Sequence, residues 1–237
     1  MKLSTNYGTQ IINFEVMYSK RKTMEIRVEP PGVVKVVVPQ NTPEQVILER
    51  VKSKGAWIVQ KLFLLRSVEY RPIKREFVNG ESFMYLGRNY SLQLQLDKTV
   101  KKPEVKLYQG KFQVKTPTND EAAIRKAMEL WYRNKTKEKV EERIKYYQHF
   151  FNIKPTNVKV KDQKKRWASC TSRNELLFNW RCVMASSPVL DYIVVHEMCH
   201  MVYKNHSQDF WGLVASIIPD YKWRKDWLKK YGVKMDL

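Results

Sequence analysis

The stretch SSPVLDYIVVHEMCHMVYKNHSQDFW, residues 186–211, decides the fold because it combines a predicted helix with three of the chain's four histidines. Ser187 and Pro188 are typical of a helix start, with Ser as the N-cap and Pro at the first helical position. His196 and His200 lie about 40° apart in projection on such a helix, so both imidazoles can bind one metal ion, with Glu197 beside them. This composition produces an H-E-x-x-H by chance in roughly 0.5% of chains.

The third histidine constrains where this helix ends. His206 follows His200 by six residues, and a continuous helix would turn it about 120° away from the first pair. The helix must therefore stop between them. Asn205 tolerates left-handed backbone, and Ser207 is a natural N-cap for a following helix, so a break is predicted near residues 204–205.

The residue types favour a catalytic zinc site. Neutral imidazoles suit zinc, and catalytic sites bind it through three protein ligands while one coordination position stays open. Glu197 is expected to be the general base and not a ligand. A lone histidine on an apolar helix is usually an ordinary half-buried residue, but the motif with a third histidine favours the metal. Cys199, on the helix's other side, is expected to be a small buried packing residue.

The residues before the motif extend the pattern. They read KKRWASCTSRNELLFNWRCVMA, residues 164–185. With the motif itself, they resemble the signature of the YgjP-like metallopeptidase family, which has an R-W-G-S-C segment, an F-N-W-R strand, V-V-H-E-L-x-H and N-H-S-x-x-F-W in that order. Weaker likenesses at residues 19–22 and 87–90 extend the resemblance over nearly the full chain. The matching residues are Arg166, Trp167, Ser169, Cys170, Phe178, Asn179, Trp180, Arg181, His196, Glu197, His200, Asn205, His206, Ser207, Phe210 and Trp211.

The resemblance implies a zincin-type fold, in which the active-site helix packs on a small sheet and His196, His200 and His206 hold zinc. It also implies that the segment from Arg166 to Cys170 borders the cleft, and Ala168 stands there where the family usually has glycine. Substrate-binding candidates in this segment are Arg166 and Ser169, and a guanidinium can bind a carboxylate or phosphate through two hydrogen bonds.

Other residues near the motif have expected structural roles. Trp167, Phe178 and Trp180 are expected in the core, because alternate large apolar residues on a hairpin usually face one. Phe210 and Trp211 are expected to anchor the helix that carries His206. Ligand imidazoles usually need a hydrogen-bond acceptor behind them, and Asp209 is a candidate for it.

The remaining sequence predicts an α+β fold, with strands mainly in the first half and helices mainly in the second. Short β-branched segments bounded by Pro, Gly and Asn-Gly predict antiparallel strands. A helix over residues 42–66 interrupts them, and Gly55 is expected to bend or divide it. Asn119 and Asp120 can cap a long amphipathic helix. We therefore expect a β-rich N-terminal region, 1–118, and a zincin-like metallohydrolase region, 119–237, with a small sheet; no internal repeat is evident.

Composition bounds the class and the environment. The 237 residues include 44 Lys and Arg against 24 Asp and Glu, a net charge of +20 that attracts polyanions or simply solvates the surface. Three cysteines without a CxxC pair exclude a disulfide framework and a four-cysteine zinc site. With no signal core and no apolar span, we expect a cytoplasmic protein without membrane association. The sequence leaves the oligomeric state open.

Three functions fit these features. The first is a zinc-dependent peptidase, with Zn²⁺ as electrophile and Glu197 as base. The second is hydrolysis of a nucleotide phosphoanhydride such as that of UTP, suggested by the net charge and by Lys164 and Lys165 next to Arg166. The third is a nucleic-acid-binding protein with structural zinc, although closed structural sites favour Cys ligands and would leave Glu197 without a role.

Overall fold

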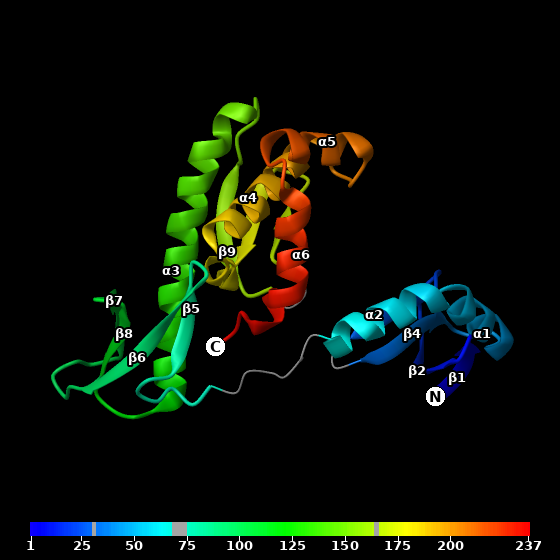
Figure 1. Cartoon of the computed structure of the whole chain (residues 1–237), viewed down its shortest axis with the longest axis horizontal. Coiled ribbons are helices and arrows are strands. Elements are labelled where there is room, and N and C mark those ends of the chain that lie inside the picture. The colour runs from blue at the N-terminus through cyan, green and yellow to red at the C-terminus, as the bar shows by residue number, and fades with distance from the viewer. Residues whose placement is uncertain (30–31, 68–74, 164–165) are drawn as a thin grey trace. The chain divides into compact units, whose positions relative to one another are not determined.

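The chain, seen in a computed structural model that describes residues 1–29, 32–67, 75–163 and 166–237, divides into two compact units, Met1–Pro72 and Ile73–Leu237 (Figure 1). The α+β class is confirmed, with strands concentrated in the first half and helices in the second. The predicted division between residues 118 and 119 does not coincide with this boundary, because it lies inside the second unit. Among the described residues, no helix combines the length and apolarity that crossing a bilayer requires.

The first unit is a four-stranded sheet covered by two helices. Its strands are β1 (Lys2–Tyr7), β2 (Gln10–Ser19), β3 (Glu25–Glu29) and β4 (Val33–Pro39), in the order β1-β2-β4-β3. Alternate residues of β2 and β4 meet α1 (Glu44–Ser53) and α2 (Gly55–Ser67) in one buried cluster. Gly55 divides the two helices as predicted. A Cβ at Gly55 would lie 2.1 Å from the Tyr7 ring, so only glycine fits there.

The second unit begins with another four-stranded sheet. It contains β5 (Ser82–Tyr85), β6 (Arg88–Leu96), β7 (Glu104–Tyr108) and β8 (Lys111–Thr116), in the order β5-β6-β8-β7. A long helix, α3 (Glu121–Tyr147), follows, and Asp120 caps it by accepting a hydrogen bond from the Ala122 N–H, as predicted. The buried stripe of α3 contacts this sheet near its start, where the Tyr132 and Phe112 rings lie 5.8 Å apart. Further along, Thr136 Oγ1 donates to the Trp180 carbonyl at 2.6 Å. The helix therefore joins the sheet to the predicted metal region in one core, which explains why no boundary falls at residue 118.

The two four-stranded sheets are internal copies of one topology. Both have an antiparallel first pair, a parallel central pair and an antiparallel last pair. The registers of the central pairs also correspond. Phe14 pairs with Val34 in the first sheet, and Leu92 pairs with Phe112 in the second. Both partners of the second pair lie the same number of residues after their counterparts in the first. The sequence shows no repeat because the copies share buried positions and turns while their residue identities differ.

A third sheet and a cluster of helices complete the second unit. The sheet has the order β10-β11-β9, formed by β9 (Asn157–Lys161), β10 (Ala168–Cys170) and β11 (Glu175–Asn179). Two 3₁₀ turns, η1 (Gln148–Phe150) and η2 (Trp180–Met184), connect elements of this part, and a third, η3 (Gly232–Lys234), follows the last helix. The helices are α4 (Ser187–Val202), α5 (Gln208–Ile217) and α6 (Tyr221–Tyr231).

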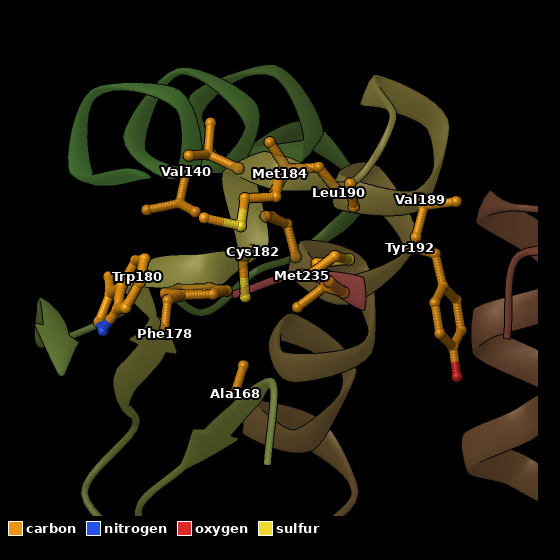
Figure 2. Packing of buried hydrophobic residues seen from close by; sticks show 14 of the residues in the cluster. Val140, Ala168, Phe178, Trp180, Cys182, Met184, Val189, Leu190, Tyr192 and Met235 are labelled. Carbon is orange, nitrogen blue, oxygen red and sulfur yellow. The ribbon is translucent and has the colours of Figure 1, made fainter. Parts of the chain in front are cut away.

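The core of this part confirms the expected burial of the hairpin aromatics. Phe178 is fully buried, Trp180 is 1% exposed, and Trp167 packs against them while partly exposed. Figure 2 shows Phe178, Trp180 and Cys182 turned into the same interior as Val140 of α3 and Leu190 of α4. The helix α4 therefore packs on a core that includes the third sheet.

Several details of the strand prediction are wrong. The central pairs β2–β4 and β6–β8 are parallel, whereas the short turns predicted antiparallel strands in the first half of the chain. Strands β9 and β11, for which no direction was predicted, are also parallel. The chain after Asn179 forms η2 and does not continue as a strand, because the Asn179 side chain accepts from the Arg181 N–H and starts the turn. Strand β1 was not predicted, because its side chains are mostly polar. A strand was predicted over the segment KREFVNG, residues 74–80, but its described residues form no strand, and β5 begins only at Ser82.

Candidate metal centre

The helix α4 carries the first two histidines and the glutamate. It begins one residue earlier than predicted, with Ser186 as the N-cap and Pro188 in its first turn. Most of the helix is buried, and Glu197 is 5% exposed, whereas His196 and His200 are half-buried. Cys199 is fully buried, as expected of a packing residue.

The chain reverses between α4 and α5, as the motif spacing predicts. The last helical residue of α4 is Val202, and Tyr203 has extended backbone, with φ −118° and ψ 112°. Ser207 caps α5, because its Oγ accepts a hydrogen bond from the Phe210 N–H at 3.3 Å. Asn205 does not take the predicted left-handed conformation, so Tyr203 makes the break. This reversal returns His206 to the first two histidines.

The three imidazoles converge on one point. Nε2 of His206 lies 3.1 Å from Nε2 of His200 and 3.1 Å from Nε2 of His196. All three ligand atoms lie within 4.8 Å of one another. A tetrahedral zinc ion with Zn–N bonds of 2.0–2.1 Å separates its nitrogen ligands by roughly 3.3 Å. The donor set and its spacing therefore fit a zinc ion, and among the described residues no further His, Cys, Asp or Glu joins the three histidines as a possible ligand.

The Tyr203 carbonyl orients one of these rings. It lies 3.0 Å from Nδ1 of His200, so this nitrogen carries the proton and donates, while Nε2 presents its lone pair to the centre. Asp209 is exposed and makes no hydrogen bond to an imidazole, so the expectation for it is wrong. A backbone carbonyl leaves no signal in the sequence, which is why this acceptor was missed. Nδ1 of His196 is buried without a hydrogen-bond partner.

Two aromatic side chains of α5 hold the histidine rings in place. The ring of Phe210, which is fully buried, stacks on His200 at 4.4 Å and meets His196 edge-on at 5.0 Å. The ring of Trp211 stacks on His206 at 5.5 Å with an interplanar angle of 19°. Phe210 and Trp211 therefore have the expected packing role, but His206 lies in the turn before α5 and not on that helix as expected.

Burial sets the protonation of the centre. It raises the pKa of Glu197 to about 8, against the opposing charge of Arg166, and leaves Glu197 Oε2 without a hydrogen-bond partner. It also lowers the pKa of His196 to about 3, with help from the charges of His200 and His206, and it lowers the pKa of His206. His196 is therefore neutral at pH 7, which is the form that binds a metal.

The structure places one of the two substrate-binding candidates near the glutamate. Arg166 is exposed, and its charge acts on Glu197. Ser169 lies on β10, an edge strand that packs beside α4, but no hydrogen bond joins the Ser169 side chain to the centre. Lys164 and Lys165 lie outside the described residues.

The family assignment follows from a comparison with known families. A family model described as "YgjP-like, metallopeptidase domain" matches residues 22–231, which include the whole motif and most of both units. Neither a curated protein nor a solved structure matches the chain. Since the matched range covers most of the sequence, the chain belongs to the YgjP-like metallopeptidase family.

Proposed function

We propose that this protein is a zinc-dependent peptidase in which His196, His200 and His206 bind the metal and Glu197 is the general base. Membership of a metallopeptidase family supports the reaction class. The observation that carries the assignment is the Glu197 carboxyl, which is buried beside three converging imidazoles and has an oxygen without a hydrogen-bond partner. Burying such a group without a partner is costly, so a catalytic use explains its presence.

The residues have separable roles in this reaction. Zinc would polarise the scissile carbonyl and make a water molecule more acidic. In its ionised form, which a bound dication would favour over the neutral form that burial favours, the Glu197 carboxylate takes the proton of the attacking water and passes it to the leaving amine. The hydrogen bond from His200 to the Tyr203 carbonyl holds one ligand ring, and the stack of Trp211 on His206 holds another.

The test compares Glu197→Gln with Asp209→Asn, because Asp209 is an exposed acidic residue of the same region. Glu197→Gln should keep about one zinc per chain by elemental analysis and lose roughly 10²- to 10⁴-fold in turnover of an unstructured peptide. Asp209→Asn should keep both properties, and His206→Ala should lose the zinc. Full activity in Glu197→Gln would overturn the mechanism, and wild-type protein that binds no zinc would overturn the metal assignment.

A second candidate function is hydrolysis of a nucleotide phosphoanhydride by the same centre. The exposed guanidinium of Arg166, close enough to influence Glu197, favours it, since such a group can bind a phosphate through two hydrogen bonds. Arg166→Met should then raise KM for UTP at least 10-fold more than KM for a neutral peptide. Equal changes in both would remove the support for this candidate.

A further inference from the structure

A basic depression lies beside the metal centre and has no role in the function proposed above. Its volume is about 320 Å³, and it is formed by α6 and the start of α5. The lining residues are Trp211, Tyr221, Lys222, Lys225, Asp226 and Lys229.

A stack of aromatic rings connects this depression to the centre. The Trp211 ring stacks on the His206 ring, with a centroid distance of 5.5 Å and an interplanar angle of 19°. It also stacks on the Tyr221 ring, with a centroid distance of 5.3 Å and an interplanar angle of 17°. The Lys225 ammonium lies 4.2 Å from the centroid of the same Trp211 ring. Since both distances are measured to the Trp211 ring, the Lys225 ammonium and the His206 ring are at most about 10 Å apart. This is about one Debye length at 0.1 M ionic strength, so salt screens their interaction only partly.

Lys225 has no carboxylate within ion-pair distance among the described residues, although Asp226 lines the same depression and its charge raises the pKa of Lys225 against the effect of burial. The nearest acidic residue along the helix, Asp226, accepts a hydrogen bond from Lys229 at 3.1 Å. No ion pair of Lys225 with a carboxylate occurs within the part of the chain that the structure describes.

A cation without an ion-pair partner beside a metal site has a physical consequence. A dication bound by the three imidazoles would be repelled by the Lys225 ammonium, and the Trp211 face compensates only partly for the ammonium's lost hydration. An anion in the depression would remove this repulsion and form a charge-assisted hydrogen bond. An unmodified peptide carries a carboxylate at its C-terminus.

We propose that Lys225 and the Trp211–Tyr221 platform form a subsite for the C-terminal carboxylate of a peptide substrate. This rests on the proposed peptidase function and deepens it. An extended peptide advances about 3.3 Å per residue, so a separation of at most about 10 Å corresponds to roughly three residues. Cleavage is therefore directed to the last few peptide bonds of the substrate.

The test compares Lys225→Met with Lys230→Met. Methionine keeps the apolar stem over Trp211 and removes the charge. Lys230 is a matched control, because it is an exposed lysine of the same helix whose ammonium lies 5.2 Å from the Tyr231 ring and does not line the depression. The substrates are one unstructured peptide with a free C-terminus and the same peptide with a C-terminal amide.

The wild type and Lys230→Met should cleave the free acid about 10- to 100-fold more efficiently than the amide, as kcat/KM, because a hydrogen bond to a charged group is lost in the amide. Lys225→Met should cleave both forms about equally. A wild type that cleaves acid and amide alike, or a Lys225→Met variant that still prefers the acid, would overturn the subsite.

A binding measurement separates this proposal from the peptidase function. Saturation-transfer NMR on EDTA-treated protein compares an N-acetyl tripeptide with its C-terminal amide, so no turnover is needed. Preference for the acid that Lys225→Met loses supports the subsite even if no peptide is cleaved. Equal binding of both forms in the wild type contradicts it, as does a loss of UTP turnover in Lys225→Met without any acid preference, which would assign the depression to phosphate.

Discussion

The turn between β5 and β6 gives a sharp test of how the fold positions α4. Leu86 and Gly87 have φ 47° and 77°, the paired positive angles of a type I′ hairpin turn. The N–H groups of these two residues donate to the carbonyls of Val183 and Met184, at 2.8 Å and 3.1 Å. A Cβ at Gly87 would lie 2.9 Å from Cα and 2.8 Å from Cβ of Ser186, the N-cap of α4. The turn thus fixes the start of the helix that carries His196.

Gly87→Ala should therefore destabilise the protein through two effects. An alanine held at positive φ costs about 1–2 kcal/mol. The collision with the Ser186 backbone adds about 1–3 kcal/mol, the usual cost of forcing an extra methyl group into a packed site. Because Ser186 has to shift, α4 shifts with it, and zinc affinity should fall about 10-fold.

A matched turn elsewhere in the same unit isolates the second effect. Gln109 and Gly110 have φ 48° and 72°, nearly the same geometry, but a Cβ at Gly110 would have nothing within 4 Å. Urea denaturation of the metal-free variants and competition with a chelator for zinc measure the two quantities. Gly110→Ala should lose only the stability that alanine at positive φ costs, about 1–2 kcal/mol, and its zinc affinity should be unchanged. If the two variants lose the same stability within about 0.5 kcal/mol, the contact with Ser186 does not constrain α4.

Three further outcomes are expected. Zinc at about 1,000 times its dissociation constant should stabilise the wild type by about 4 kcal/mol, and His206→Ala should abolish the shift in Tm that a calorimeter records; no shift in the wild type would contradict a preformed site. In EDTA, the folded protein keeps a proton on Glu197 up to about pH 8 that the unfolded chain releases near pH 4.5, so wild-type stability should fall relative to Glu197→Gln as pH rises between these values, by at most about 1.4 kcal/mol per pH unit. If urea titrations gave wild type and Glu197→Gln the same dependence of stability on pH, the raised pKa of Glu197 would be refuted. Thr136→Val leaves the buried Trp180 carbonyl without its donor and should cost about 1–3 kcal/mol in the same assay, and a cost near zero would mean that water replaces the hydroxyl.

The local features of the site could be predicted because each depends on residues close together in the chain. The four-residue spacing of His196 and His200 on a helix, the need for a break before His206 and the Ser207 cap all follow from helix geometry, and the structure confirms them. The role of these histidines as zinc ligands stays a prediction. The same holds for Glu197 as base and for Arg166 and Ser169 as substrate-binding residues.

The features that the sequence did not predict depend on residues far apart in the chain. Short turns suggested antiparallel neighbours, but β2 pairs in parallel with β4 and β6 with β8, since β3 and β7 move to the outer edges of their sheets. The duplication of these sheets was hidden for the same reason, because it is a property of pairing and register. Helix α3 packs both on the sheet before it and on η2 after it. The second compact unit therefore includes that sheet and begins at Ile73, far before residue 118.

The sequence by itself determined the α+β class, the family resemblance and the histidine motif, because patterns of apolar residues, helix caps and motif spacing act over a few turns of chain. Only the tertiary structure decided what surrounds each of these residues. The Tyr203 carbonyl, the unpartnered Glu197 oxygen and the Lys225 ammonium over Trp211 became visible when packing brought them together. Burial, which perturbs the pKa of Glu197 and of His196, is a property of the folded core and has no counterpart in the linear sequence.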